Sequence, residues 1–405
     1  MKARALALLG AMIMAVTSGC AMASFPLLND SVGTHAAALG DLDGDGDLDS
    51  FLANGGDDAG FGDSVWVNQG GAQGGQAGKY LANGQQLGWG NSQSVALGDL
   101  DGDGDPDAVV GSAGGFQIYL NGGGRQAGPA GSFVAFKRFE KPDGVSGVLN
   151  VRLGDLNGDG HLDVYAAACC GGMLSSNGAD QFIPSYNQVW LNDGNAIFSI
   201  SEELPVIQGS QAVALGDLDG DGDTDVYVAN DYAVIDAQGD LERNQPDRVW
   251  LNDGAGHFSD SGQRLGEFPS TAVALGDLDG DGDPDAFVAT RGSALVWLNN
   301  GAGQFSDSGQ RLGNQRAGAV WLGDLDGDKD LDAFIHAPEG SSIWLNDGAG
   351  RFSLSRQELS VPMYYATALG DLNGDGDLDL FAGFLNRDYK VWWNDGYGRL
   401  GTSWR

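Results

Sequence analysis

The chain has 405 residues, of which 68 are glycine, and its 56 acidic and 21 basic residues give a formal net charge of −35 at pH 7. A charge this negative argues against nucleic-acid binding, because Lys and Arg must neutralise phosphates there, and against a polybasic membrane-binding surface. Hydrophobic residues make up 42% of the chain, which is enough for a large core, so wholesale disorder is not expected.

Residues 1–23 have the pattern of a bacterial export signal. A basic start precedes an apolar run over 5–16, which is too short to cross a bilayer. Two processing sites overlap at its end: Ala-Met-Ala at 21–23 fits ordinary cleavage before residue 24, whereas Val-Thr-Ser-Gly-Cys at 16–20 resembles a lipobox that would lipidate Cys20. Either site predicts an extracytoplasmic protein without a transmembrane segment, which is secreted, periplasmic or held at the outer membrane as a lipoprotein.

The remaining two cysteines, Cys169 and Cys170, are adjacent. In an oxidising compartment they form a vicinal disulfide or remain as two reduced thiols after a strand, and both alternatives are open. No Cys-x-x-Cys or Cys/His spacing predicts a zinc site.

One acidic segment recurs seven times, at intervals of 47–62 residues. The copies are GDLDGDGDLD at 40–49, GDLDGDGDPD at 98–107, GDLNGDGHLD at 154–163, GDLDGDGDTD at 216–225, GDLDGDGDPD at 276–285, GDLDGDKDLD at 323–332 and GDLNGDGDLD at 370–379. Each copy is followed by an aromatic motif such as Val249-Trp250-Leu251-Asn252, and most continue as Asp-Gly-x-Gly-x-Phe. A repeat at this period predicts a solenoid, a propeller or an array.

Each repeat predicts four short strands. An apolar run such as 271–275 leads into the acidic loop, and a second run such as 286–289 leaves it. The aromatic motif is the third strand, its Asn-Asp-Gly sequence is a strong hairpin turn, and the fourth strand begins at the following Phe. We therefore expect an all-β, seven-bladed β-propeller over residues 24–405, with four antiparallel strands per blade and the acidic loops as A–B hairpins.

Two further expectations follow from this repeat. The aromatic residue of the third strand occupies the same slot in every copy, and we expect it in the core between blades. The ring is closed either by 398–405, which would supply the last outer strand, or by 25–29, which would clasp it from the N-terminal side.

The acidic loops and the VWLNDGxGxF segments resemble the FG-GAP and VCBS repeat families, the propeller type of integrin α-subunit heads. The resemblance covers residues 24–405. It implies calcium loops on a propeller, and it leaves the biological role open because these repeats occur in adhesins, lectins and some carbohydrate-active enzymes.

The loop positions predict calcium ligands. Counted from the first Asp, positions 1, 5 and 9 are Asp in all seven copies, position 3 is Asp or Asn, and position 7 is a histidine in the third copy, which fits a backbone carbonyl ligand there. Oxygen ligands at 1, 3, 5, 7 and 9 have the spacing with which a tight loop wraps Ca²⁺. An EF-hand is excluded because position 12 lies in a β run and is not Glu.

We expect up to seven Ca²⁺ ions, held by the following residues: Asp41, Asp43, Asp45, Asp47 and Asp49; Asp99, Asp101, Asp103, Asp105 and Asp107; Asp155, Asn157, Asp159, His161 and Asp163; Asp217, Asp219, Asp221, Asp223 and Asp225; Asp277, Asp279, Asp281, Asp283 and Asp285; Asp324, Asp326, Asp328, Asp330 and Asp332; Asp371, Asn373, Asp375, Asp377 and Asp379. Position 6 is Gly in six copies, which indicates a positive φ, and Lys329 replaces it in the sixth copy. We expect that loop to be the weakest site.

No catalytic residue is predicted, because the four histidines lie outside recognisable catalytic motifs and the aspartates are assigned to metal. The favoured function is a monomeric binding or adhesion module for an extracellular protein or glycan, and the alternative is a polysaccharide lyase on the same propeller. The long B–C connections 168–188 and 230–248 are the expected ligand surface, since long loops are disproportionately functional. Their candidate residues are Cys169, Cys170, Tyr186, Asn187, Asp231, Tyr232, Arg243 and Arg248.

Overall fold

The computed structural model describes residues 33–402 with short gaps at 56–61, 72–73, 89–90, 113, 124–127, 141–146, 169–171, 177–178, 184, 207–208, 233, 236–240, 243–244, 315–316, 339, 358, 362–365 and 385–387. The expected export segment 1–23 and the alternative clasp 25–29 lie outside the described residues. Within the described part of the chain, no helix is long and apolar enough to cross a membrane.

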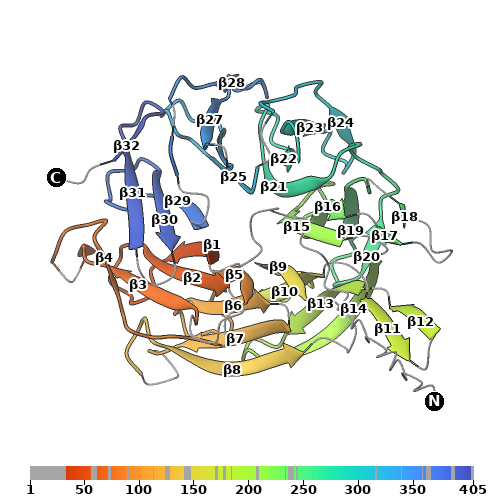
Figure 1. Cartoon of the computed structure of the whole chain (residues 1–405), viewed down its shortest axis with the longest axis horizontal. Helices are drawn as coiled ribbons and strands as arrows, with labels where there is room; N and C mark the ends of the chain where they lie inside the picture. The colour runs from red at the N-terminus through yellow and green to blue at the C-terminus, as the bar shows by residue number, and fades with distance from the viewer. Residues whose placement is uncertain are drawn as a thin grey trace, which may run out of the picture.

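Seven four-stranded antiparallel sheets stand as blades around a common axis, with the first strand of each blade innermost (Figure 1). The blades are β1 (Gly33–Gly40), β2 (Asp49–Gly55), β3 (Ser64–Asn68) and β4 (Tyr80–Ala82); β5 (Ser92–Gly98), β6 (Asp107–Ser112), β7 (Gly115–Asn121) and β8 (Phe133–Glu140); β9 (Val148–Gly154), β10 (Asp163–Ala168), β13 (Ser185–Asn192) and β14 (Phe198–Val206); β15 (Gly209–Gly216), β16 (Asp225–Tyr232), β19 (Arg248–Asn252) and β20 (Phe258–Asp260); β21 (Ser270–Gly276), β22 (Asp285–Thr290), β23 (Leu295–Asn299) and β24 (Phe305–Asp307); β25 (Ala319–Gly323), β26 (Asp332–His336), β27 (Ser342–Leu345) and β28 (Ser353–Leu354); and β29 (Ala366–Gly370), β30 (Asp379–Phe384), β31 (Asp388–Asn394) and β32 (Leu400–Thr402). The expected all-β, seven-bladed propeller is confirmed.

The two long B–C connections contain secondary structure of their own. The connection in the third blade forms the hairpin β11 (Gly172–Ser176) and β12 (Ala179–Ile183), and the one in the fourth blade forms β17 (Val234–Ile235) and β18 (Leu241–Glu242). Both hairpins lie at the outer side of blades 3 and 4 in Figure 1. The connections are therefore folded extensions of two neighbouring blades.

Among the described residues the hydrophobic core forms seven clusters, and each cluster lies between two neighbouring blades. The aromatic residue of the third strand belongs to one of these clusters in every blade, as expected, although Trp190 and Trp250 are only partly buried. The seven residues, in chain order, are Trp66, Tyr119, Trp190, Trp250, Trp297, Trp344 and Trp392. Because each blade buries its face only against its neighbours, the ring must close for the first and last blades to be stable.

The ring closes by packing of blade 7 against blade 1. One cluster joins β1, β2 and β3 to β29, β30 and β31, and the side-chain amide of Asn68 donates to the carbonyl of Leu372 (3.2 Å). The backbone N–H of Tyr80 also donates to the hydroxyl of Tyr389 (3.0 Å). Strand β32 supplies the outer edge of blade 7, so the C-terminal alternative for the last outer strand is confirmed.

Candidate metal centres

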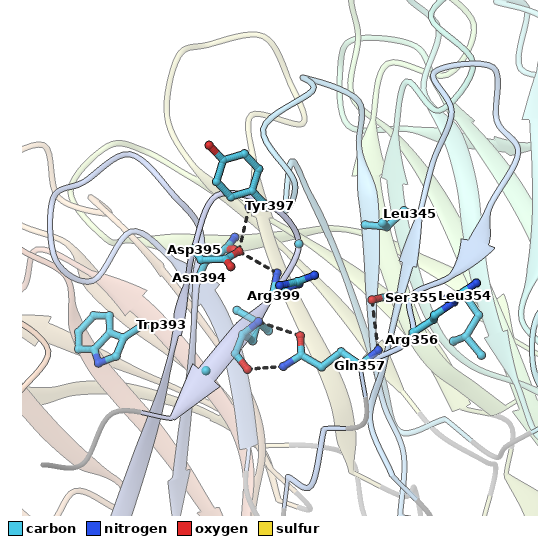
Figure 2. Close-up of a pocket in the computed structure, with 13 residues that line it drawn as sticks. Leu345, Leu354, Ser355, Arg356, Gln357, Trp393, Asn394, Asp395, Tyr397 and Arg399 are labelled. Atoms are coloured by element: carbon cyan, nitrogen blue, oxygen red, sulfur yellow. Dashed lines mark hydrogen bonds between the residues drawn. The ribbon is translucent and has the colours of Figure 1, made fainter.

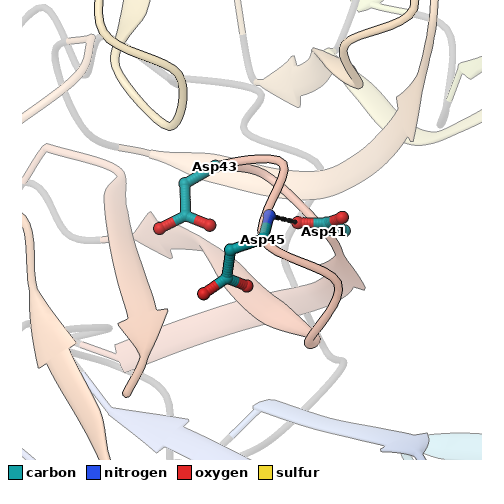
Figure 3. A group of neighbouring side chains, drawn as sticks. All are labelled: Asp41, Asp43 and Asp45. Carbon is teal, nitrogen blue, oxygen red and sulfur yellow. Dashed lines mark hydrogen bonds between the residues drawn. The ribbon is translucent and has the colours of Figure 1, made fainter. Parts of the chain in front are cut away.

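The acidic loops connect the first and second strands of each blade. In blade 1, for example, Gly40 pairs with Asp49, so positions 1 to 8 form the loop. In five loops three carboxylate oxygens lie within 4.8 Å of one another, and Figure 3 shows the first of these groups. The groups are Asp41, Asp43 and Asp45; Asp99, Asp101 and Asp107; Asp217, Asp219 and Asp225; Asp277, Asp279 and Asp285; and Asp324, Asp326 and Asp332. In the other two loops position 3 is Asn157 or Asn373, which offers an amide oxygen.

The first Asp of each loop winds the backbone around its own carboxylate. In the fifth loop, Asp277 accepts hydrogen bonds from the N–H groups of Gly280 (2.8 Å) and Gly282 (3.0 Å). Gly282 has φ of 95°, and Lys329 at the same position of the sixth loop has φ of 80°. The expected positive φ at position 6 is confirmed, and Lys329 adopts it although left-handed geometry is unfavourable for a residue with a Cβ.

The ninth residue is a buried Asp that ties three segments together. In the fifth loop, Asp285 is 0% exposed, one of its oxygens accepts from the N–H of Leu278 (3.0 Å) and the other accepts from the N–H of Asn299 (2.7 Å). The same two bonds recur in all seven copies. Each oxygen keeps a second lone pair, so position 9 can hold the loop and also coordinate a cation.

Burial is the main cause that raises the pKa of these ninth residues. It raises the pKa of Asp49 and Asp107 to about 7 and that of Asp225, Asp285 and Asp332 to about 6, and the backbone hydrogen bonds oppose this rise. A cation at the loop favours the ionised form and removes this penalty. The loops are therefore electrostatically suited to a divalent ion.

The aspartates at position 3 of the loops show whether the site fits a metal ion, because a buried carboxylate oxygen needs a partner. The Oδ1 atoms of Asp219 and Asp279 are buried and accept no hydrogen bond from the described residues. Burial and the neighbouring loop carboxylates raise the pKa of both groups. Because buried polar atoms are normally paired, these oxygens fit the hard oxygen-ligand set that Ca²⁺ prefers.

Every loop is also held by the next blade. The carbonyl of Leu218 in the fourth loop accepts from the side-chain amide of Asn299 (2.8 Å) and from the N–H of Gly303 (2.7 Å), and both donors belong to blade 5. The Asn of the aromatic motif makes the equivalent bond to the preceding blade in all seven copies. The acidic loops and the hairpins between the third and fourth strands therefore form one continuous ring of contacts.

Four residues of the expected ligand surface have described side chains. Asn187 is 1% exposed and donates to the Tyr165 hydroxyl, Asp231 is 5% exposed and binds Arg291 through two hydrogen bonds of 2.5 and 2.6 Å, and Arg248 is paired with Asp260 at 2.9 Å. Tyr186 is half-buried in β13, and Tyr232 ends β16 with its side chain outside the description. Cys169, Cys170 and Arg243 lie outside the described residues.

In blades 1, 3 and 4, a polar residue near the start of the third strand forms a buried link to the next blade, which sequence reasoning missed. Asp247 accepts hydrogen bonds from the N–H of Asn230 (2.9 Å) and from the hydroxyls of Ser270 (2.8 Å) and Tyr227 (3.1 Å). Ser270 belongs to the next blade. Asp63 and Asn187 occupy the same place in blades 1 and 3, and burial raises the pKa of Asp63 and Asp247 to about 7.

A glutamine side chain forms a second inter-blade link that was missed. Gln310 accepts from the N–H of Phe352 (2.9 Å) and donates to the carbonyl of Gly350 (2.6 Å), so it binds the next blade as a short strand would. Gln85, Gln263 and Gln357 form the corresponding bonds. The signal was present in the sequence, because Ser-Gly-Gln-Arg-Leu-Gly occurs at both 261–266 and 308–313.

Comparisons with known proteins agree with this architecture. The FG-GAP-like repeat family matches at residues 41–110, 99–166, 174–228, 229–288, 277–335 and 324–382. Integrin alpha-7 from Homo sapiens is 28% identical in an alignment of 177 residues that covers 38% of this chain and 14% of that protein, so the chain corresponds to a small part of this relative.

Two solved structures have the same fold at low identity. A lectin from Agrocybe aegerita that recognises non-reducing terminal N-acetylglucosamine is 19% identical with a TM-score of 0.54, and the match covers 90% of this chain and 92% of the lectin. A protein from Lactobacillus plantarum is 12% identical with a TM-score of 0.58, over 87% of this chain and 94% of that protein. At these identities the likeness concerns the fold.

Proposed function

Since the chain belongs to the FG-GAP-like repeat family, we propose that it is an exported, calcium-stabilised binding module. The observation that carries the calcium assignment is the convergence of three carboxylates in each of five loops, at positions 1, 3 and 9 in four of them and at positions 1, 3 and 5 in the first. The buried Oδ1 atoms of Asp219 and Asp279, which accept no hydrogen bond from the described residues, support it. The residues at positions 1, 3, 5 and 9 and the carbonyl at position 7 would hold each ion. The N-terminal segment 1–23 supports export.

Calcium would stabilise the ring through the contacts between blades. Extracellular calcium modules bind with dissociation constants of roughly 10⁻⁴ to 10⁻³ M. At about 1 mM Ca²⁺ and a dissociation constant of about 0.1 mM, each site adds about 1.4 kcal/mol to the free energy of unfolding. Thermal melts in 1 mM Ca²⁺ and in chelator test this, and an equal midpoint in both would contradict the metal assignment.

A single-site variant sharpens the calcium test. Asp279→Ala removes a third-position ligand and should lower the number of bound ions by one in a calorimetric titration. The exposed carboxylate of Glu203 lies outside the loops, so Glu203→Gln is the matched control and should bind as many ions as the wild type. If both variants bind the same number, position 3 does not coordinate calcium.

The ligand of the module is proposed to bind at the two long B–C connections. Their hairpins β11–β12 and β17–β18 extend two neighbouring blades, whereas the connection in blade 5 is only Arg291-Gly292-Ser293. Replacing only the hairpin segments 172–183 and 234–242 with a short turn keeps the buried Asn187, Asp231 and Asp247. This change should leave folding and calcium binding intact and abolish capture of a ligand found on glycan and extracellular-protein arrays. A lyase assay on acidic polysaccharides, run beside the arrays, separates binding from turnover.

A further inference from the structure

A groove lies between the outer edges of blades 6 and 7, and its volume of about 910 Å³ is in the range of small-molecule sites. One wall consists of residues 354–357, from the end of β28 onward, and the other is the hairpin 393–401, which includes the end of β31 and the start of β32. Figure 2 shows Leu354 and Arg356 on the first wall, and Tyr397 and Arg399 on the second.

The first wall departs from the repeat. Blades 4 and 5 carry the identical segment FSDSGQRLG at 258–266 and 305–313, whereas blade 6 has FSLSRQELS at 352–360. Leu354 therefore stands where the other two copies have Asp, and Arg356 stands where they have Gly. In blades 4 and 5 that Asp is paired with the Arg four residues later, at 2.9 and 2.7 Å. The substitution of Leu removes this pair from blade 6 and leaves an apolar surface.

The second wall departs from the repeat in the same groove. Tyr397 occupies the hairpin position that is Ala302 in blade 5 and Ala349 in blade 6. Its side chain is 79% exposed, and that of Leu354 is 57% exposed. The two walls thus present two large exposed side chains, Leu354 and Tyr397, which the equivalent positions of blades 4 and 5 and of blades 5 and 6 lack.

The groove also contains two guanidinium groups without an ion partner. Arg356 and Arg399 are exposed, and neither forms a salt bridge within the described residues. The carboxylate of Asp395 accepts the backbone N–H groups of Tyr397 (3.0 Å) and Arg399 (3.3 Å), so it shapes the hairpin. The charged lining residues that the structure describes are Arg356, Arg399 and Asp395, which together carry one net positive charge in a chain whose net charge is −35.

The backbone edge of the groove is closed to strand addition. Gln357 accepts the N–H of Leu400 (2.9 Å) and donates to its carbonyl, so both backbone groups at this point of β32 are occupied. A peptide that adds a strand needs such groups free. A ligand here must therefore be recognised by side chains, namely the aromatic ring of Tyr397, the aliphatic side chain of Leu354 and the guanidinium groups of two arginines.

We propose that this groove binds a carboxylated saccharide, with the Tyr397 ring against the sugar face and Arg356 and Arg399 pairing with the carboxylate. Guanidinium groups bind carboxylates through charge-assisted, often bidentate hydrogen bonds, and an exposed tyrosine offers an apolar face with a polar tip. The proposal rests on the binding-module function proposed above and adds a second site and a ligand class to it.

The test uses the full chain in 1 mM Ca²⁺ and 0.15 M NaCl, which screens the repulsion between the acidic protein and an anionic ligand. The probes are oligosaccharides that contain glucuronate, galacturonate or sialate, each compared with its own methyl ester by calorimetry. At least one acid should bind about tenfold more tightly than its ester, the strength of a good charge-assisted pair. Equal binding of every acid and its ester, or binding of none, overturns the proposal.

The variants introduce residues that other blades already carry at the equivalent positions, so folding should be preserved. Arg356→Gly with Arg399→Gln should remove the preference for the acid, and Tyr397→Ala should weaken both acid and ester. Arg351 holds the place of Arg399 in the hairpin of blade 6, which makes Arg351→Gln the matched control, and this variant should bind as the wild type does. Undiminished acid binding by the double variant refutes the site.

Failure of this groove and failure of the module are distinguishable. If the groove variants keep all saccharide binding but shortening the two B–C connections abolishes capture, the groove proposal is wrong and the proposed function stands. If the wild-type chain captures nothing on any array, both are wrong. If an acidic peptide binds in the groove and no saccharide does, the saccharide assignment is overturned.

Discussion

Replacement of Asp247 by Asn should stabilise the protein above neutral pH and have little effect in mild acid. The carboxyl group is buried between blades 4 and 5, and burial raises its pKa from 3.8 to about 7. Between pH 4 and 7, the carboxyl group of Asp247 therefore keeps a proton in the folded chain that it has released in the unfolded chain. As pH rises through this range, the group lowers the free energy of unfolding, and this loss is complete above pH 7. One pKa unit corresponds to about 1.4 kcal/mol, which gives an upper limit of about 4 kcal/mol.

Blade 3 shows why the asparagine should be tolerated. Asn187 holds the equivalent place and donates from its amide to the hydroxyls of Tyr165 (3.1 Å) and Ser210 (3.1 Å). Asp247 has a tyrosine and a serine in the same two positions, so an asparagine there finds the same partners. We expect Asp247→Asn to gain about 1 to 4 kcal/mol at pH 8.

Urea unfolding from pH 5 to 8.5 in excess Ca²⁺ measures this, with the difference between variant and wild type as the readout. The difference should grow between pH 5 and 7 and then stay constant. Asn187→Asp is the converse experiment and should introduce the same pH dependence into blade 3, while Glu203→Gln on the surface should introduce none. A difference that is independent of pH would show that the carboxyl of Asp247 ionises normally in the folded protein, and the reasoning from burial would be refuted.

Three further changes test the loops and the blade contacts. Lys329→Gly relieves a positive φ of 80° and should raise the calcium affinity of the sixth loop about fivefold in a calorimetric titration; an unchanged affinity would mean that the strain does not oppose binding. Gly62→Ala places a Cβ 2.7 Å from the backbone carbonyl oxygen of Leu87, whereas Gly401→Ala meets nothing within 4 Å. The first should therefore cost about 1–3 kcal/mol more by urea unfolding, and equal losses would contradict it. Gln310→Ala removes two hydrogen bonds between blades 5 and 6 and should lower the free energy of unfolding by about 1–3 kcal/mol, while the exposed Gln304→Ala should be neutral.

Much of the fold could be predicted because each blade is encoded locally. The acidic loop, the aromatic third strand and the Asn-Asp-Gly turn follow one another in every repeat, and each predicts its own element. The positive φ at position 6 was predicted because six of the seven copies have glycine there. The lysine of the remaining copy, Lys329, also has a positive φ, of 80°. Comparison of seven copies of one chain thus replaces much of what an alignment would supply.

What could not be predicted involves contacts between distant segments. Nothing adjacent to Asp63 or Asp247 in the sequence indicates that each meets a serine of the next blade, 29 or 23 residues later. The burial of Asn187 and Asp231, both expected on the ligand surface, has the same origin, because their partners lie on other strands and blades. Local patterns predict elements, whereas burial of a polar residue depends on which blades meet.

The repeat separates residues that hold the ring from residues that are free to change. Between 352 and 360 the sixth blade keeps the buried Phe352 and Leu359 and the Gln357 that binds blade 7, and it alters the exposed positions between them. Four-stranded blades are stabilised almost wholly by their neighbours, so a substitution is tolerated where it touches neither the adjacent blade nor the metal loop. In the groove between blades 6 and 7, Gln357, Asn394 and Gly398 keep the contacts with the neighbouring blade. The residues that differ there, Leu354, Arg356 and Tyr397, are exposed, which is why a binding site can arise without loss of the propeller.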